Sequence, residues 1–501
     1  MQQIGQLVDT SVNLVWLKRD LRLRDHQPLL NAALNGKKIV VLFLFEPMLI
    51  QDPHYDIRHW RFVWQSLEDL NKQLSDYQTK VLVRYQDARS AFQSIAQQHN
   101  ISAVYSYQEI GLDNTFERDR EMTRWFSDNE IEWQEFEYGA VKRGLKRRLD
   151  WQQNWYITMR ANCDDTALHS LNWINHQEIT GLDQSDSLPQ EWKNSDPAFQ
   201  QGGECRAWYT LHHFFEKRGK EYTFSLSSPI ASRAACSRLS PYLAWGNISI
   251  RQVYQFVLKN WQKQGWRRTL VAFSSRLHWH CHFVQKFESE SQMQFRPVNK
   301  AYLNYQYLDG PDKKIRLNAW KSGKTGFPLI DACMRCLHQT GYINFRMRSM
   351  LVSFLCHHLD IDWRDGVTHL ASLFLDFEPG IHYPQFQMQA GVTGINIIRL
   401  YNPVKQSKEK DPDGEFIRRF IPEISALPNA LLHTPWLLTA MEEQIYSVII
   451  GEHYPKPIID IDASARRARD KLWAFQKRDD VQQEGRRVLK THTLPDRPRN
   501  M

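Results

Sequence analysis

Two arginines stand in a run whose apolar composition predicts a buried helix. Arg346 and Arg348 come directly before Met350–Leu355, and a guanidinium group in such surroundings needs an acidic partner. Asp376 and Glu378, in an irregular segment further along the chain, are the natural candidates. An arginine and a carboxylate fixed side by side can hold the polar edge of a large flat cofactor. Ion pairing that only stabilises the fold explains the same residues equally well.

A second group of residues has the composition of an anion site. In Cys236–Leu243, the hydroxyl residues Ser237 and Ser240 stand where a helix is expected to begin. Exposed N–H groups and the helix dipole at such a position favour a phosphate group. The alternative is an ordinary helix cap, which needs the same residue types.

Two residue pairs have spacings that metal sites use. His278 and His282 are four residues apart on one face of a predicted helix, but no Glu accompanies them in the order His-Glu-x-x-His. Cys333 and Cys336 lie inside an apolar helical pattern, and no second Cys-x-x-Cys follows. We predict packing or ligand-facing roles for the histidines, core packing for the cysteines, and no metal site.

The composition indicates a soluble protein that can bind a polyanion. The 501 residues carry a net charge of +8, and 18 of them are tryptophan. A basic balance permits a nucleic-acid partner, although surface lysines alone would also produce it. No apolar run approaches the roughly 20 residues of a membrane span, and the N-terminus lacks the pattern of a secretion signal. Scattered cysteines are typical of reduced thiols, so we expect a cytoplasmic location and no membrane.

Strand and helix patterns alternate in the first part of the chain. Short β-branched runs at 12–17, 38–45, 80–84 and 102–106 are separated by amphipathic stretches of helical length. This predicts an α/β domain, a parallel sheet with helices on both faces, and no Gly-x-Gly-x-x-Gly motif follows its first strand. From Glu204 onward the patterns predict an all-α domain. The predicted divisions are the α/β domain at 10–136, a connector at 137–205, a helical domain at 206–450, and a C-terminal helix with a basic tail at 451–501.

Motifs along nearly the whole chain resemble those of the photolyase/cryptochrome family. In the family's order, they lie at Val15–Arg22, Ser237–Gly246, Trp320–Pro328, Asp331–Arg335, Asp362–Gly366 and Asn402–Arg418. The resemblance implies an N-terminal α/β domain of the antenna type. It also implies a helical domain that holds FAD in a folded, U-shaped conformation.

The same resemblance implies roles for individual residues. Its flavin contacts carry over to Tyr222, Cys236, Ser237, Arg238, Leu239, Ser240, His280, Phe283, Arg348, Asp376, Phe377, Glu378 and His382. Positions on the DNA side carry over to Arg276, Trp279, Phe345, Arg346 and Gln406. Trp279 matches the aromatic residue on which a flipped lesion rests. Catalytic roles are expected for Arg276, Trp279, Trp363, His382 and Tyr383.

Some positions depart from the family's repair enzymes. Arg276 stands where cyclobutane-dimer repairers have a Glu, and Ser349 stands where they have a Met. The histidines of a (6-4) repairer would lie at Phe345 and Ser349 and are absent there. We expect the Arg276 guanidinium to donate hydrogen bonds to a thymine carbonyl, or to interact with the negative charge on the flavin radical.

The family's electron relay also differs in this sequence. Trp363 matches its middle tryptophan, but the flavin-proximal place falls at Phe386. Because phenylalanine is hard to oxidise, Tyr383 or another aromatic residue is expected to stand in. His382 matches a position near the flavin nitrogen that decides which radical form is stable.

Two classes of function follow from the resemblance. In the first, excited reduced FAD passes an electron to a pyrimidine dimer in DNA, the dimer splits, and the electron returns. This predicts a deoxyribodipyrimidine photo-lyase, acting as a monomer on damaged DNA with the lesion flipped out. The alternative is a cryptochrome-like blue-light photoreceptor without repair activity, which the changed lesion-facing residues favour. A flavin-binding protein without a light function is a third reading.

An antenna chromophore is a further expectation from the resemblance. Its pocket is predicted in the first domain, near Glu109 and the basic segment after Asp20. A pterin, a deazaflavin or a lumazine would suit it, or the pocket is empty.

Overall fold

A computed structural model describes residues 11–494. The end of the predicted basic tail, 495–501, and the first residue of the predicted α/β domain lie outside this range. The chain forms two compact units. One comprises the chain up to Lys142, Tyr156–Tyr209 and Leu239–Leu258, and the other comprises Arg143–Trp155, Thr210–Arg238 and the chain from Lys259 onward. The predicted contiguous divisions stay a prediction.

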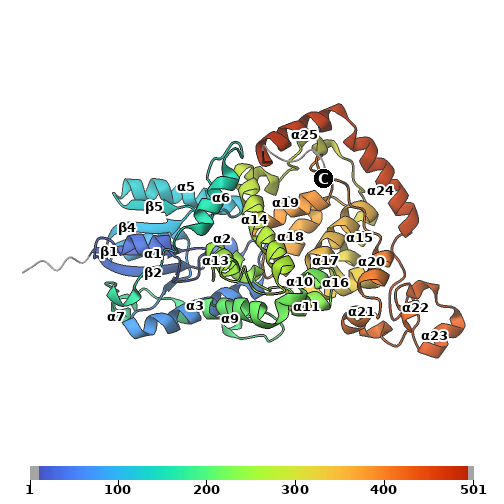
Figure 1. The fold of residues 1–501 in the computed structure, drawn as a ribbon, viewed down its shortest axis with the longest axis horizontal. Coiled ribbons are helices and arrows are strands. Elements are labelled where there is room, and N and C mark those ends of the chain that lie inside the picture. The colour runs from blue at the N-terminus through green and yellow to red at the C-terminus, as the bar shows by residue number, and fades with distance from the viewer. Residues whose placement is uncertain (1–10, 495–501) are drawn as a thin grey trace, which may run out of the picture. The chain divides into compact units, whose positions relative to one another are not determined.

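The first unit is built on a five-stranded parallel sheet in the order β3-β2-β1-β4-β5. The strands are β1 (Ser11–Leu17), β2 (Lys38–Leu44), β3 (Leu82–Arg84), β4 (Asn100–Tyr107) and β5 (Glu132–Phe136). Every residue of β1 is buried, as expected for a strand covered by helices on both faces. The predicted α/β fold is therefore confirmed (Figure 1).

Alternate residues of the strands pack on different helices. Val12, Leu14 and Trp16 belong to a core cluster with Phe92 of α4 (Ala88–Ala96) and Phe126 of α5 (Asp113–Asp128), because successive side chains of a strand point to opposite faces. The helices that lie wholly within the first unit are α1 (Gln27–Ala32), α2 (Pro47–Ile50), α3 (Ile57–Leu74), α4 (Ala88–Ala96), α5 (Asp113–Asp128), α7 (His176–Ile179), α8 (Gln190–Lys193) and α12 (Ser240–Ala244). Three helices contain residues of both units, α6 (Trp151–Arg160), α9 (Glu204–His213) and α13 (Ile250–Lys259).

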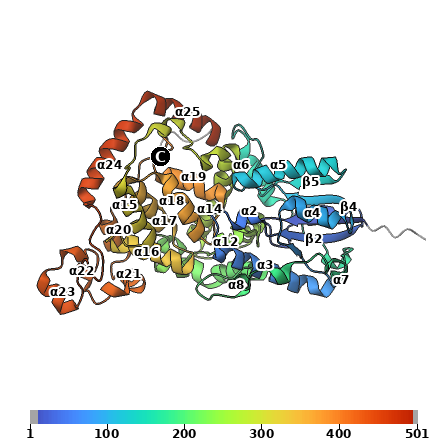
Figure 2. The same cartoon turned by 180° about the vertical axis from the view of Figure 1, so that it is seen from behind.

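The second unit is helical in the part of it that the structure describes, apart from one isolated bridge. Its helices are α10 (Tyr222–Ser225), α11 (Ala231–Ala235), α14 (Arg267–Ser289), α15 (Pro311–Ser322), α16 (Pro328–Thr340), α17 (Phe345–Ser353), α18 (Trp363–Leu373), α19 (Pro379–Gln389), α20 (Pro403–Lys410), α21 (Glu415–Phe420), α22 (Asn429–Leu432), α23 (Ala440–Tyr446), α24 (Ile461–Gln476) and α25 (Asp479–His492). A π-helical turn, Phe354–His358, continues α17. Both cartoon views show α14, α17, α18 and α19 together (Figures 1 and 2).

One close helix contact positions the residues of interest. Helices α14 and α19 meet at Gly380, where an added Cβ would lie 3.0 Å from the Cα of Val284. Glycine allows this approach because it has no side chain. The helix face that carries His280 is thereby held against the start of α19.

The two cysteines with metal-like spacing are buried in α16. Within residues 11–494, no three His, Cys, Asp or Glu side chains are grouped so that they could hold a metal ion. Over the same residues, no helix combines the length and the apolar character needed to cross a membrane.

Candidate functional site

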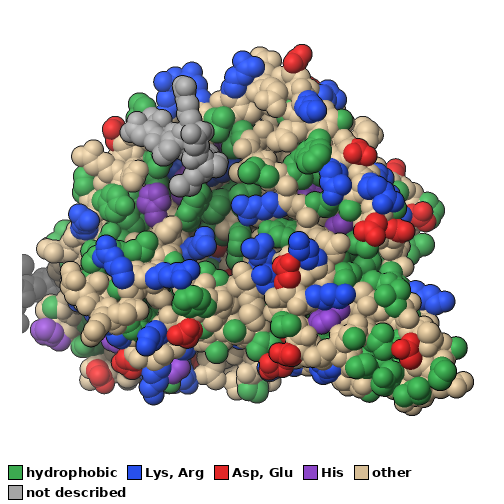
Figure 3. Space-filling model, turned by 45° about the vertical axis from the view of Figure 1, so that its right-hand side comes forward, with side chains coloured by type: hydrophobic (Ala, Val, Ile, Leu, Met, Phe, Trp, Pro, Cys, Tyr) green, Lys and Arg blue, Asp and Glu red, His purple; other side chains and the backbone are tan. Residues whose placement is uncertain are grey.

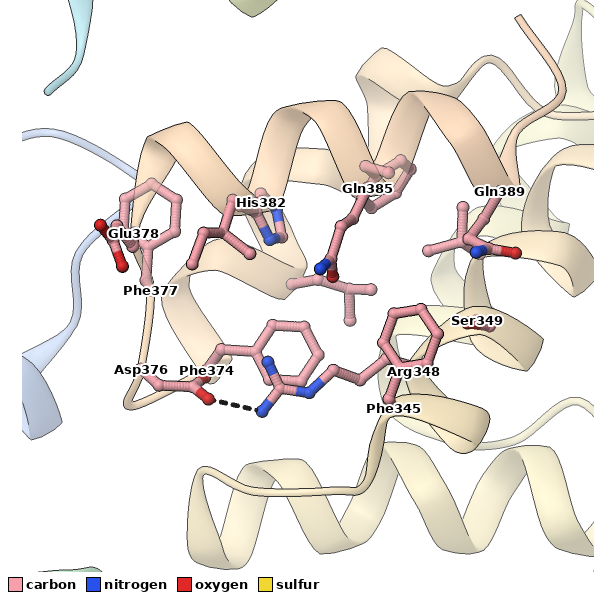
Figure 4. A pocket seen from close by; sticks show the side chains of 14 residues that line it. Phe345, Arg348, Ser349, Phe374, Asp376, Phe377, Glu378, His382, Gln385 and Gln389 are labelled. Carbon is pink, nitrogen blue, oxygen red and sulfur yellow. Dashed lines mark hydrogen bonds and ion pairs between the residues drawn. The ribbon is translucent and has the colours of Figure 1, made fainter. Parts of the chain in front are cut away.

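A pocket in the second unit is formed by α17, α18, α19 and the segment between α18 and α19 (Figure 4). It holds about 480 Å³ of free space, counting the part open to solvent, which is within the range for small-molecule sites. Its walls consist of Phe345, Arg348, Ser349, Val352, Leu370, Phe374, Asp376, Phe377, Glu378, Ile381, His382, Gln385, Phe386 and Gln389.

A helix cap and a proline in the sequence fix where the two main pocket-lining helices, α17 and α19, begin. Asn344 caps α17, with its side chain accepting a hydrogen bond from the Met347 amide and its own amide donating to the Leu226 and Ser228 carbonyls. Helix α19 starts with Pro379, whose fixed φ suits the first turn of a helix. The arginine and the carboxylates therefore come from a capped helix and from a short, fixed turn.

Arg348 pairs with Asp376, one of its two predicted candidate partners. Its guanidinium donates to Asp376 Oδ2 at 2.8 Å and to the Ile343 carbonyl at 3.0 Å. It also lies over the ring of Phe374, 4.0 Å from the centroid. These contacts fix the plane of a charged group that lines the pocket (Figure 4).

Glu378 pairs with a histidine, whereas the sequence predicted an arginine as its partner. Its Oε2 lies 3.0 Å from Nε2 of His280 on α14. Arg346, the second arginine of the predicted helix, lies over the ring of Tyr401 instead. The two carboxylates that follow α18 therefore have different cationic partners.

His382 lies on the pocket-lining face of α19. Its Nε2 is 2.8 Å from the Val367 carbonyl, so Nε2 carries the proton when the ring is neutral. Its ring contacts those of Phe377 and Phe386 at centroid distances of 5.3 and 5.6 Å. The backbone carbonyl of Val367 therefore fixes the tautomer of His382, and Nδ1 is the nitrogen without a proton when the ring is neutral.

Aromatic contacts lead away from this wall. The ring of Trp363 lies 6.5 Å from that of Phe386 and 6.4 Å from that of Tyr383, between centroids. Trp363 and Tyr383 are both buried. Tyr383 is also 5.9 Å from the imidazole of His382, so it connects the pocket wall to Trp363 without using Phe386.

Four predicted residues follow one another along α14. Trp279 is 45% exposed, and its ring lies 5.6 Å from that of Phe283, one turn further. Arg276 is exposed one turn earlier, and His280 is the partner of Glu378. An exposed indole thus directly precedes the residue that pairs with the pocket wall.

Other predicted residues lie outside the set that lines the pocket. Gln406, on α20, is one of them, whereas Phe345 does line the pocket and is 43% exposed. Tyr222 on α10 is buried, and burial raises its pKa to about 12 even though Arg276 hydrogen-bonds its hydroxyl. Arg346 does not line the pocket.

The predicted anion-binding run is divided between the two units. Cys236, Ser237 and Arg238 belong to the second unit, and the carbonyls of Cys236 and Ser237 accept hydrogen bonds from Arg218. Leu239 and Ser240 belong to the first, where Leu239 caps α12 without a side-chain bond and Ser240 is its first residue. Neither serine therefore caps that helix.

Three polar residues of the pocket were not predicted as site residues. These are Ser349, Gln385 and Gln389, of which the last two follow His382 on the same face of α19 at helical spacing. Within residues 11–494, the Ser349 hydroxyl and both amide atoms of Gln389 are buried without a hydrogen-bond partner. Such groups call for a ligand or water, and they fit the polar heteroatoms of a flavin.

A second pocket lies within the first unit, at the predicted position near Glu109. Arg118 pairs there with both Glu46 and Glu109, and burial raises the pKa of Glu46 to about 7 despite this pairing. Lys18 and Arg19 line the same pocket together with Trp16, Tyr55, Trp60 and Trp245. These two basic residues come before Asp20, whereas the predicted basic segment after Asp20 is not part of the lining.

Comparisons with known proteins cover both units. Residues 13–141 match the family model for DNA photolyase, and residues 273–474 match the model for the FAD-binding domain of DNA photolyase. The chain is 27% identical to a cryptochrome DASH from Synechocystis sp., over 91% of this chain and 96% of that protein. It is also 27% identical to a deoxyribodipyrimidine photo-lyase from Alkalihalophilus pseudofirmus, over 94% and 98% of the two chains.

Solved structures give the same result. A cryptochrome from Synechocystis sp. PCC6803 superposes with a TM-score of 0.79 at 26% identity, covering 92% of this chain and 99% of that one. A bacterial class III photolyase from Agrobacterium tumefaciens shares the fold, with a TM-score of 0.78 at 22% identity over 95% and 100% of the two chains. With an FAD-binding domain that contains the pocket of Figure 4, this chain belongs to the photolyase/cryptochrome family and takes FAD as its cofactor.

Proposed function

We propose that the protein repairs pyrimidine dimers in DNA by light-driven electron transfer from reduced FAD. The observation that carries this proposal is the position of Trp279. This indole is half exposed and directly precedes His280, whose partner Glu378 lines the flavin pocket. A base that stacks on Trp279 would therefore be close to the pocket wall.

The pocket residues would hold and shield the flavin. Arg348, fixed by Asp376, presents donors to a polar edge, and the buried hydroxyl of Ser349 and amide of Gln389 offer further hydrogen bonds. Phe374, Phe377 and Phe386 line the same space with apolar surface and keep water from it. When bound and reduced, FAD supplies the electron that light drives onto the dimer.

The exposed residues beside the pocket would hold the lesion. Flipped bases stack on aromatic side chains, and this stacking contributes about 1–3 kcal/mol per base. Trp279 and Phe345 are both exposed aromatic residues, and Arg276 is exposed one helical turn from Trp279. The guanidinium would donate to a thymine carbonyl or to a phosphate.

The charge of the molecule supports a DNA partner. The net charge is +8, and Figure 3 shows Lys and Arg side chains around a hollow with hydrophobic side chains inside it. Basic groups around a hollow suit a phosphate backbone whose damaged bases enter the hollow. Arg346 and Gln406 are further residues that we assign to this DNA contact.

The test is illumination of the purified, reduced protein with oligonucleotides that contain a defined lesion. Single- and double-stranded substrates with a cyclobutane dimer or a (6-4) product should be compared. We expect thymine absorbance to return with the cyclobutane dimer, in the light only. Absence of repair with both lesions would contradict the proposal.

Arg276, Phe345 and Ser349 also favour a second candidate function, a cryptochrome-like photoreceptor without repair activity. They replace the residues that face the lesion in the family's repair enzymes. Such a receptor would keep the FAD pocket and respond to blue light. Light-dependent changes in flavin absorbance without repair of either lesion would support the receptor.

We further propose that the pocket near Glu109 holds an antenna chromophore. Its aromatic lining, with Trp16, Trp60 and Trp245, suits a flat ring system, and Lys18 and Arg19 suit an acidic substituent. An archaeal photolyase from Sulfolobus tokodaii, which shares the fold at a TM-score of 0.74 and 22% identity over 92% of this chain and 100% of that one, was solved with two FAD molecules. Extraction of the purified protein, with chromatography of the released pigments, tests the proposal.

We also propose that the protein works in the cytoplasm as a monomer. Size-exclusion chromatography with light scattering would test the second statement.

A further inference from the structure

A histidine and a carboxylate form an ion pair at the wall of the flavin pocket. The Nε2 atom of His280, in the middle of α14, is 3.0 Å from Oε2 of Glu378, which directly precedes α19. Their side chains are only 12% and 6% exposed. Glu378 lines the pocket, whereas His280 is not one of the lining residues. The close approach of α14 and α19 at Gly380 holds the two side chains together.

The pair differs chemically from the other ion pair of the pocket. The cation of the pair between Arg348 and Asp376 is permanent, because a guanidinium does not lose its proton in a protein. An imidazolium can lose its proton, and with it the charge. The walls therefore contain one fixed pair and one pair whose net charge depends on a proton. With His280 protonated, both pairs are neutral overall.

We propose that His280 is a positioning residue that holds Glu378 in place and balances its charge, so that the pocket accepts FAD in its reduced, negatively charged form. This inference rests on the FAD-binding domain and is independent of DNA repair. If His280 lacked its charge, Glu378 would be a buried carboxylate without a counter-ion beside the flavin. Negative charge added to the flavin would then be repelled.

The surroundings of His280 support a protonated imidazole. From its own helix, Cys281 is the neighbouring titratable group; from α19 and the segment before it, Glu378, His382 and Asp376 face the pocket, and from α17 Arg348 does. Burial lowers the pKa of His280, but the Glu378 carboxylate outweighs this effect and brings the pKa to about 10. The proton is therefore present at neutral pH.

The coupling is reciprocal, which gives the direction of the expected effect. If the proton on His280 favours reduction of the flavin, reduction must raise the proton affinity of His280 to the same extent. Removing the charge but keeping Glu378 should make FAD harder to reduce. Removing both charges should restore the wild-type behaviour.

The test measures the reduction potential of bound FAD at pH 7.5, without DNA or light, in four proteins. We expect His280→Asn to lower the ratio of reduced to oxidised FAD roughly tenfold at a fixed potential. His280→Arg, which restores a positive charge, and the double variant His280→Asn/Glu378→Gln should each stay within about twofold of the wild type. His278→Asn serves as a control on the same helix, because His278 packs against Trp151 and Trp155.

Two results would overturn the inference. One is a His280→Asn protein with the wild-type potential, and the other is a double variant shifted as far as His280→Asn. If His280→Asn fails to retain FAD, retention by His280→Arg and by the double variant would support charge balance. Loss of FAD from both His280→Arg and the double variant would contradict charge balance, because the shape of the His280 side chain, and not its charge, would then determine FAD binding. Loss of DNA repair in wild-type protein would leave these measurements unaffected.

Discussion

At the scale of single residues, the ion pair between Arg348 and Asp376 is the clearest feature of the site. The two residues are 28 positions apart. The need of a guanidinium in an apolar helix for a carboxylate predicted Asp376 and Glu378 as the candidate partners, and the family resemblance pointed to Asp376 for Arg348. The pairing of Glu378 with His280 was not predicted. Ion pairs between helices depend on how the helices cross, and residue types alone do not contain that information.

Removal of the Asp376 carboxylate should release the flavin. Asp376→Asn keeps the shape but leaves Arg348 without its counter-ion, and breaking such a partly buried pair costs about 1–3 kcal/mol. We expect FAD affinity to fall roughly 10- to 100-fold, as measured by flavin retention during gel filtration and by titration of the apoprotein. Asp365→Asn is the matched control, because its pair with Lys313 is partly exposed. Equal effects of the two variants would contradict a specific role for Asp376.

Arg276 should contribute to DNA affinity. It is exposed on α14, one turn from Trp279, and a charge-assisted hydrogen bond to a phosphate or a carbonyl contributes about 1.5–3 kcal/mol. We expect Arg276→Ala to weaken binding of dimer-containing DNA roughly tenfold in a fluorescence anisotropy titration. Arg267→Ala, at the start of the same helix and stacked on Trp261, removes an equal charge as a control. If Arg276→Ala changes neither affinity nor repair rate, the assignment is wrong.

At the scale of elements, the sequence predicted four of the five strands and missed β5. The missed strand, Glu132–Phe136, is only partly buried, so it lacks the continuous apolar run by which buried parallel strands are recognised. On helix α19, His382 was predicted as a flavin contact, but the helix itself and its residues Gln385 and Gln389 were not predicted, for a related reason. It contains Pro379 and Pro384, which argue against a helix in sequence, and its Gln385 and Gln389 resemble surface residues until the fold turns them inward.

The contact between α14 and α19 should be sensitive to one added methyl group. Gly380→Ala would bring Cβ within 3.0 Å of the Val284 backbone, and overpacking of this kind costs about 1–3 kcal/mol. We expect a lower thermal unfolding temperature together with a loss of bound FAD. Gly181→Ala meets no atom within 4 Å and serves as the control. A fully stable Gly380→Ala protein with normal FAD content would show that the two helices can separate at no cost.

The π-helical turn after α17 should make the fold sensitive to acid. Burial lowers the pKa of His357 to about 4, with a further contribution from His358, whereas an unfolded histidine has a pKa near 6.5. Between pH 4 and pH 6.5, His357 therefore binds a proton in the unfolded chain but not in the folded chain. The contribution of the neutral His357 to the free energy of unfolding is therefore fully present above pH 6.5. It is lost as the pH is lowered towards 4, which amounts to about 3 kcal/mol for this residue.

The variant His357→Gln isolates this effect. Glutamine can still donate to the Gln389 carbonyl, which is 3.0 Å from His357 Nε2, but it does not titrate. Asp331, whose pKa burial raises to about 6, acts in the opposite direction, so the difference between variant and wild type is the useful quantity. Urea unfolding from pH 4.5 to 7 should show a smaller pH slope for His357→Gln. His338→Gln, an exposed histidine that also contacts a carbonyl, should keep the wild-type slope.

At the scale of the whole molecule, the net charge of +8 and the stacking platform at Trp279 should make separable contributions to DNA binding. Phosphate contacts release counter-ions, so affinity falls steeply with salt, by about a thousandfold between 50 and 200 mM if six phosphates are neutralised. Stacking of a flipped dimer on an indole involves no counter-ions. The preference for damaged over undamaged DNA should therefore be nearly independent of salt.

Anisotropy titrations of damaged and undamaged duplexes at several salt concentrations would measure both quantities. We expect Trp279→Ala, which removes the exposed indole, to reduce the preference for damaged DNA roughly tenfold and to leave the salt slope unchanged. Arg276→Ala should make the slope shallower by about one unit when its guanidinium contacts a phosphate, and leave the slope unchanged when it contacts a thymine carbonyl. A preference for damaged DNA that disappears with salt, or a changed slope in Trp279→Ala, would mean that charge and not stacking selects the lesion. No preference at any salt concentration would favour the photoreceptor, because a receptor needs the flavin pocket but not a platform for a flipped base.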